Sequence, residues 1–371
     1  MKKLLFLAAM SSVALASCVS DESPSIDATP SGKAISFNAP VMYSQTKAVV
    51  HTGEIVGTYP TDEAFCVYAV WTPESYTKWD ATGNSAKWYM STGGAGIKVK
   101  YDAGIDDGTT PGNGAWAPET NYYWPKNGYL TFAAYSPADA AGTFNYGANG
   151  LTITGFTVDG TASNQYDLMY SDRAYNKTTS TVGSNTMYDG VDIKFYHALS
   201  SIKFKVKLYE DYDVNTIITL TGITVNKVKS KGDFKETITD GASYDAAPEW
   251  TNQTDEISTA YRAYPKTTET QQVLYNGGTA QELTDGSNQT SNDLILLPQT
   301  LGDEAIITVN YTIKSKDSAE INQSAEVRIK SLTPKWEIGT RYTYTIIFAL
   351  DKIYFAPSVE NWIDDSSEID I

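Results

Sequence analysis

The sequence is poor in the residues that most hydrolases and metalloproteins use for chemistry. Its 371 residues include only two histidines, His51 and His197. This scarcity excludes histidine-rich metal sites and zinc proteases, which need several imidazole ligands. His197 lies at the end of an expected strand, where a structural hydrogen bond is the simplest role for it.

Positive charge is also scarce. The chain has 28 Lys and Arg against 44 Asp and Glu, and its formal net charge is −16 at pH 7. A protein with this balance repels polyanions, which argues against nucleic acid and anionic lipid surfaces as partners. Long apolar runs are missing too, because no segment after residue 15 has the length needed to span a bilayer.

Catalytic motifs are absent as well. The sequence contains neither Gly-x-Ser-x-Gly nor a glycine-rich phosphate loop. Ser-x-x-Lys occurs at Ser44, Ser75 and Ser200, but the companion Lys-Thr-Gly is missing, so these matches are attributed to chance. We therefore predict that the protein has no catalytic residue and no cofactor, and that it is not an enzyme.

One acidic loop offers oxygen atoms to a metal ion. Asp102, Asp106 and Asp107 lie among glycines within residues 91–121. Carboxylates and backbone carbonyls are the ligands that calcium prefers. A solvated acidic loop explains the same residues, and we predict no metal site there.

The N-terminus has the pattern of a bacterial lipoprotein signal. Lys2 and Lys3 precede a short apolar run, and the sequence Leu-Ala-Ser leads into Cys18. Residues 1–17 are therefore predicted to be a signal peptide, and Cys18 to be acylated and to hold the protein on a membrane. The alternative is a secreted protein with an incidental cysteine. Acylation of Cys18 would leave Cys66 alone, so no internal disulfide is expected.

Apolar and polar residues alternate along much of the chain, whereas helical periodicity is nearly absent. Such alternation predicts strands with one face in a core and one face in water. The 26 Tyr and 8 Trp residues are also typical of strands. Cys66 falls in one such strand and should be an unreactive core residue. The alternating segments are residues 65–70, 130–135, 151–154, 202–208, 306–313 and 342–348.

About 350 residues remain after the signal peptide, which is long for one core and suits two domains. Residues 176–190 are rich in Asn, Gly, Ser and Thr, and we place the domain boundary there. The predicted units are an N-terminal β-sandwich at 48–188 and a C-terminal β-sandwich at 189–371. Several tryptophans are expected to fill these cores, although they are also suited to stacking on sugar rings. They are Trp71, Trp79, Trp88 and Trp116.

Four stretches of the sequence resemble fimbrillin-like proteins, the family of type V pilins and their minor subunits. They are residues 122–137, 195–200, 339–344 and 359–362, in the family's order. The resemblance implies an all-β fold of two transthyretin-like β-sandwiches in tandem behind a lipoprotein signal peptide. It also implies a precursor exported to the cell surface and the outer membrane.

The resemblance further implies how such a subunit assembles into a fimbria. A trypsin-like protease removes the N-terminal strand, and the C-terminal strand of another pilus subunit fills the groove that is left. Within residues 18–47, the alternation around Ile35 and Phe37 fits a removable strand, and Lys47 before Ala48 offers a basic cleavage point. The chain has no arginine before Arg173, so a protease strict for arginine would spare it.

The candidate donor strand is residues 358–371. Asp364 and Asp365 begin a polar interruption in this segment, and an ordinary last strand with a frayed acidic tail explains it equally well. Two other functions stay open, namely a pilus tip or anchor subunit and a monomeric surface lipoprotein that binds a glycan or a host receptor. The apolar residues proposed to enter the groove are Val359, Ile363, Ile369 and Ile371.

Overall fold

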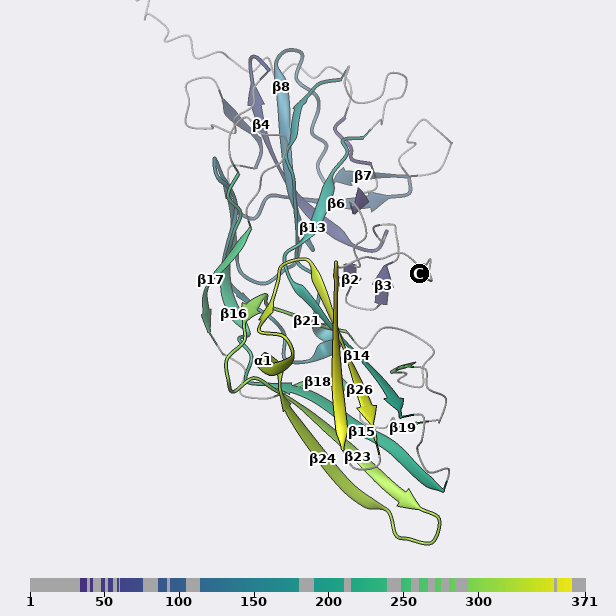
Figure 1. Cartoon of the computed structure of the whole chain (residues 1–371). Coiled ribbons are helices and arrows are strands. Elements are labelled where there is room, and N and C mark those ends of the chain that lie inside the picture. The colour runs from purple at the N-terminus through teal and green to yellow at the C-terminus, as the bar shows by residue number, and fades with distance from the viewer. Residues whose placement is uncertain are drawn as a thin grey trace, which may run out of the picture.

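The structure is a computed structural model, and nearly all of its regular elements are strands (Figure 1). The only helices in the described part are η1 (Ala162–Asn164) and α1 (Ile329–Leu332), which confirms the predicted all-β fold. Neither is long and apolar enough to cross a membrane. The described residues are 34–38, 41–42, 48–50, 53–55, 59, 61–75, 86–91, 94–104, 114–179, 190–209, 215–238, 248–254, 260–265, 271–274, 280–283, 293–349 and 352–361.

The N-terminal half is built around one large sheet of nine strands. Seven of them lie in the order β1 (Val41–Met42), β13 (Lys194–His197), β11 (Met169–Ser171), β8 (Tyr129–Ser136), β4 (Ala64–Thr72), β6 (Ile97–Asp102) and β7 (Ala115–Pro118). The other two, β12 (Ala174–Lys177) and β5 (Lys87–Met90), pair with β8 and β4.

Strand β4 is buried on both faces, and β8 nearly so. Phe65 and Val67 of β4 point into one apolar cluster, whereas Cys66 and Tyr68 point into another. The expectation that such strands keep one face in water is therefore wrong here, because protein covers both faces of this sheet. A central strand between two cores needs apolar residues on both faces, and β4 contains them at every position before its last residue, Thr72. Cys66 is buried, as predicted.

A smaller sheet covers one face of the large sheet. Tyr135 of the large sheet stacks on Phe144 with ring centroids 4.1 Å apart, and Tyr68 packs on Tyr146 at 5.1 Å. Strands from both predicted domain ranges share this smaller sheet. The division at residue 188 stays a prediction, because shared pairing does not show which parts fold independently. The strand order is β17 (Glu249–Thr254), β16 (Lys231–Lys235), β10 (Gly150–Thr157) and β9 (Thr143–Gly147).

The C-terminal half contains two five-stranded sheets. In the first, β20 (Gln281–Glu282), β14 (Ser200–Leu208), β26 (Thr340–Phe348) and β27 (Ile353–Asn361) are neighbours, and β21 (Leu294–Leu296) also pairs with β14. In the second, β18 (Tyr261–Tyr264), β15 (Thr216–Asn226), β23 (Ile306–Ser315) and β24 (Ile321–Arg328) are neighbours, and β19 (Gln272–Val273) also pairs with β15. Two small pairs complete the described strands, β2 (Ala48–Val50) with β3 (Gly53–Ile55) and β22 (Gln299–Thr300) with β25 (Lys335–Trp336).

The two C-terminal sheets face each other across an aromatic and aliphatic core. Tyr311 of β23 meets Phe348 of β26 edge to face at 5.1 Å. In β14 the buried Ile202, Phe204, Val206 and Leu208 alternate with half-buried lysines, which confirms the predicted alternation. Trp336 donates a hydrogen bond from Nε1 to the Tyr344 hydroxyl at 3.0 Å, so its polar atom is satisfied inside the core.

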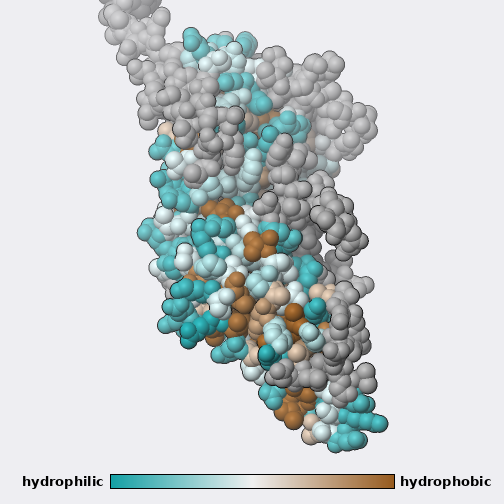
Figure 2. Space-filling view, viewed as in Figure 1, coloured by the Kyte–Doolittle hydropathy of each residue, from teal (hydrophilic) through white to brown (hydrophobic). Residues whose placement is uncertain are grey.

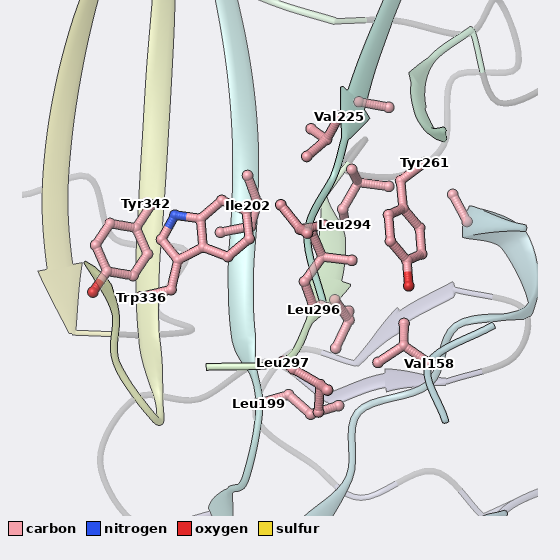
Figure 3. Close-up of a cluster of buried hydrophobic side chains, with 14 of the residues drawn as sticks. Val158, Leu199, Ile202, Val225, Tyr261, Leu294, Leu296, Leu297, Trp336 and Tyr342 are labelled. Atoms are coloured by element: carbon pink, nitrogen blue, oxygen red, sulfur yellow. The ribbon is translucent and has the colours of Figure 1, made fainter. Parts of the chain in front are cut away.

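The same core continues across the middle of the molecule. Figure 3 shows Val158 from the N-terminal half close to Leu297, and Leu294 between Ile202 and Tyr261. Polar contacts span this region as well. The Trp250 indole donates to the Ala198 carbonyl at 2.6 Å, and the Ile295 backbone N–H donates to the Gln165 side chain at 2.8 Å.

Candidate functional site

The extended segment 34–38 lies between two other parts of the N-terminal half and forms hydrogen bonds with both. On one side, the Ile35 N–H donates to the Tyr122 carbonyl at 2.7 Å, and the Phe37 N–H donates to the Trp116 carbonyl at 2.8 Å. On the other side, the Val191 N–H donates to the Ser36 carbonyl at 2.9 Å. The segment runs antiparallel to β7 and parallel to the residues that lead into β13.

This placement closes the large sheet. In the strand order, β7 lies at one end of the sheet and β1 with β13 at the other. Segment 34–38 bridges to Trp116 of β7 and to Val191, three residues before β13. Without it, both ends would expose unpaired backbone groups, a ready template for another strand.

The side chains of Ile35 and Phe37 fill pockets inside the closed sheet. Each is 1% exposed. The Phe37 ring meets Phe65 at 5.8 Å and Phe132 at 5.6 Å, both edge to face. Burying two such side chains contributes about 2–3 kcal/mol each. The pockets therefore bind the segment tightly, and they would be empty without it.

Gly190 and Asn38 fix the path of the segment. A Cβ atom on Gly190 would lie 2.2 Å from the Asn38 backbone nitrogen, so a larger residue does not fit there. The Asn38 side chain donates to Asp192 at 2.6 Å and accepts from the Gly190 N–H at 3.2 Å. Sequence reasoning missed these three residues, because nothing in the local pattern links residue 38 to residue 190.

We call the site that segment 34–38 occupies between Trp116 and Val191 the groove. The structure places the predicted strand residues Ile35 and Phe37 in this groove. Cys18 and Lys47 lie outside the described residues. Ala48 begins β2, of which the structure describes the backbone pairing with β3. Acylation of Cys18 and cleavage between Lys47 and Ala48 stay predictions.

Strand β27 contrasts with segment 34–38 because it lies at the edge of its sheet. Among the described strands its only partner is β26, with which it pairs antiparallel from Phe348 opposite Ile353 to Thr340 opposite Asn361. Ile353 and Phe355 are half-buried, and Val359 is 58% exposed. Figure 2 shows apolar atoms on the lower half of this face, the region of α1 and the C-terminal sheets in Figure 1.

The predicted donor residues fall partly on this strand. Residues 358–361 belong to β27, whereas Ile363, Ile369 and Ile371 lie outside the described residues. Both hypotheses, donor strand and ordinary last strand, are compatible with an exposed edge strand.

The buried polar groups between the two halves serve structure. The His197 Nδ1 atom is hydrogen-bonded to Asp167, and both side chains are fully buried, which confirms the structural role expected for His197. Burial raises the pKa of Asp167 well above its usual value, and burial with the nearby Arg341 lowers the pKa of His197. Ser201 donates to Asp293 at 2.7 Å. Both members of each pair are buried, so none of these groups is open to a substrate.

Another buried carboxyl lies beneath the turn between β9 and β10. Glu236 accepts a hydrogen bond from the Leu151 N–H at 2.9 Å, and burial raises its pKa to about 7. Nearby, Arg173 donates to the Tyr146 hydroxyl at 3.0 Å and to the carbonyl of Ala148 at 2.8 Å. These contacts hold the turn on the sheet below it.

Two further predictions concern ligands. Asp102 accepts a hydrogen bond from the Gly104 N–H at 2.8 Å, while Asp106 and Asp107 lie outside the described residues. Within the described part, no group of three or more His, Cys, Asp or Glu is placed to hold a metal ion. Trp71 and Trp116 are each 2% exposed, which confirms them as core residues rather than sugar platforms. Trp88 packs against the core, and Trp79 lies outside the described residues.

Comparison with known proteins identifies relatives across most of the chain. A family model described as fimbrillin-like matches residues 76–362. A search of curated proteins found no match. Among solved structures, a fimbrial protein from Bacteroides vulgatus is 17% identical with a TM-score of 0.53, covering 89% of this chain and 99% of its own. That match shows a shared fold.

Two other solved structures have lower scores. A protein assigned to cell adhesion from Bacteroides uniformis is 15% identical with a TM-score of 0.45, covering 90% of this chain and all of its own. The tip fimbrial protein Mfa3 from Porphyromonas gingivalis, truncated at its C-terminus, is 10% identical with a TM-score of 0.33, covering 87% of this chain and all of its own. These TM-scores are too low to argue from.

Proposed function

Because the chain belongs to the fimbrillin-like family, whose members are structural subunits of pili and not enzymes, we propose that it assembles into a surface fimbria by donor-strand exchange. In this reaction, proteolysis after Lys47 frees segment 34–38, and the C-terminal strand of a second subunit takes its place. Other pilus subunits and a trypsin-like protease are therefore its partners.

The observation that supports this function most is the pairing of segment 34–38 on both of its edges. Four backbone hydrogen bonds join it to Tyr122, Trp116 and Val191, and two apolar side chains fill pockets beneath it. Removing such a strand leaves unpaired donors and acceptors together with empty apolar pockets. A replacement strand restores both, since main-chain bonds supply affinity and alternate side chains supply specificity.

The route to the cell surface rests on Cys18. Acyl chains on this residue would hold the precursor on the outer membrane until cleavage after Lys47 releases the subunit from its anchor. A subunit that escapes cleavage would keep its anchor. The basic residue at the cleavage point is Lys47, and the chain has no arginine before Arg173. A protease specific for arginine would therefore not cut here, and the chain would keep its lipid anchor at the base of the fimbria.

The function is tested with purified protein carrying a recognition site for a sequence-specific protease after Lys47. After cleavage is verified by mass spectrometry, the protein should form a ladder of oligomers on a denaturing gel run without heating. A second protein that lacks residues 353–371, which include all of β27 and the predicted donor segment 358–371, should shorten the ladder in proportion to its share of the mixture.

Cleaved protein that stays monomeric at high concentration would overturn the exchange mechanism. The chain would then be an anchor or tip subunit. The uncleaved protein is the matched control and should remain monomeric throughout, because its groove is filled.

A further inference from the structure

Segment 34–38 with β1, and β27, carry the same sequence pattern although they lie at opposite ends of the chain. Residues 35–41 read Ile-Ser-Phe-Asn-Ala-Pro-Val, and residues 353–359 read Ile-Tyr-Phe-Ala-Pro-Ser-Val. Isoleucine, phenylalanine and valine occupy the first, third and seventh positions of both. Each stretch also contains an Ala-Pro pair between the phenylalanine and the valine.

The two stretches also present the shared residues in the same way. Ile35 and Phe37 point together into the core of the large sheet. Ile353 and Phe355 likewise share one face of β27 and pack at the margin of the C-terminal core. In a strand, residues two apart lie on one face, so either pair fits two adjacent pockets.

From this match we infer that β27 of a second copy of this chain fills the groove, with Ile353 in the place of Ile35 and Phe355 in the place of Phe37. The inference rests on the proposed exchange mechanism and adds its register and direction. The donor strand then runs as the removed strand did, antiparallel to Trp116 and parallel to Val191. Val359 follows at the position of Val41.

The aromatic pocket sets the register. Phe37 lies against Phe65 and Phe132, and Tyr59 and Trp116 of the same cluster pack against Phe65. A side chain smaller than phenylalanine would leave a cavity in this pocket. The alternative register at the end of the chain offers Ile369 and Ile371, which would underfill it.

Exchange gives up the nine-residue pairing of β27 with β26 and encloses the apolar side chains of β27 in the groove. Among the strands that the structure describes, β27 has a partner along one edge only, and its inward residues Ile353 and Phe355 are half-buried. In the groove it would be paired along both edges, with both side chains enclosed. Pro357 has no N–H to donate, which an edge strand tolerates, and the removed segment carries Pro40 one position later.

One position differs in size between the two strands. Ser36 is 2% exposed, whereas Tyr354, which would take its place, is 43% exposed in its own subunit. A tyrosine needs more room than the serine leaves. Tyr354→Ser should therefore increase the rate of exchange, and Phe355→Ala should reduce its extent by about a hundredfold.

The register is tested by disulfide cross-linking in full-length protein with the protease site after Lys47. Ala34 is the partner of Tyr123 across the groove, and Lys352 is the residue that would replace Ala34. The variant Lys352→Cys with Tyr123→Cys should form an intersubunit disulfide after cleavage and none before it. The matched control is Glu368→Cys with Tyr123→Cys, which reports the register of Ile369 and Ile371.

The outcomes separate the register from the mechanism. A cross-link through residue 352 and none through residue 368 supports the inference. A cross-link through residue 368 alone overturns it. Ladders without either cross-link also overturn it, because the donor then lies elsewhere. Verified cleavage without ladders overturns the exchange mechanism itself, before any question of register.

Discussion

Segment 34–38 and β27 are both short extended stretches near the ends of the chain, yet they are held very differently. The first is paired on both edges and encloses two apolar side chains at 1% exposure. The second is paired on one edge and leaves Val359 58% exposed. A strand bound in this way at the N-terminus completes a core, whereas the release of an edge strand such as β27 breaks its pairing with one neighbour, β26.

The largest expected effect comes from emptying the aromatic pocket. Phe37→Ala removes a ring that meets Phe65 and Phe132, and it should lower the free energy of unfolding by about 3–5 kcal/mol. Urea unfolding followed by tryptophan fluorescence measures this loss. A change in the free energy of unfolding below about 1 kcal/mol would mean that segment 34–38 is held no more tightly than the edge strand β27.

Glu236 lies away from both strands, so a change at this carboxyl should alter the stability of the whole protein without altering the release of either strand. Burial raises the pKa of Glu236 from 4.5 to about 7. The folded state thus favours the protonated form, so the stability that this group contributes is present below pH 4.5 and is lost as the pH rises to about 7.

Glu236→Gln resembles the protonated form and should stabilise the protein above pH 7 by up to about 3 kcal/mol. Denaturant unfolding across pH measures the difference, which should vanish below pH 4.5. Glu249→Gln, at a side chain that is 54% exposed, is the matched control for removing a carboxylate from the surface. Equal stabilisation at every pH would show that the Glu236 carboxyl does not titrate as described.

The path of the N-terminal segment is tested next. Gly190→Ala places a Cβ atom 2.2 Å from the Asn38 backbone nitrogen, and the shift needed to relieve it should cost about 1–3 kcal/mol. Gly147→Ala is the control, because a Cβ there meets nothing within 4 Å. Hydrogen exchange should accelerate at Ile35 and Phe37 in the first variant only. Acceleration in both would mean that Gly190 has no special role.

The smallest effect is expected at the edge strand. Val359→Ala removes methyl groups that are mostly in water, so it should change the free energy of unfolding by less than about 0.5 kcal/mol. Thermal unfolding of the uncleaved protein measures it. A loss comparable to that of Phe37→Ala would mean that β27 is an integral strand that does not leave.

The alternation of apolar and polar residues predicted where the strands lie better than it predicted what packs against them. Alternation located β14 and β23, because each has one buried face and one wetter face, and it located β26, whose second half alternates in the same way. It also located β4, but nothing in the spacing of its residues shows that a second sheet covers its other face. That cover comes from residues such as Phe144 and Tyr146, about 80 positions later.

The site was predicted in part for the same reason. Ile35 and Phe37 alternate as a strand should, and family resemblance suggested that this strand is removable. Their partners Trp116 and Val191 are distant in sequence and became visible only through the sheet pairing. The match between residues 35–41 and 353–359 can be read from the sequence alone. It suggests an exchange of strands only because the structure buries the first strand and leaves the second at an exposed edge.

The backbone N–H of Val191 reports most directly on the central claim, because in the intact chain it donates to the Ser36 carbonyl at 2.9 Å. Hydrogen exchange at this amide should be compared in the uncleaved protein, in cleaved monomer separated from its fragment, and in oligomers. Strand exchange predicts slow exchange, then fast exchange, then slow exchange again in these three states. An amide that stays fast in the oligomers, or that stays slow in the cleaved monomer, would contradict the replacement of segment 34–38 by a strand from another subunit.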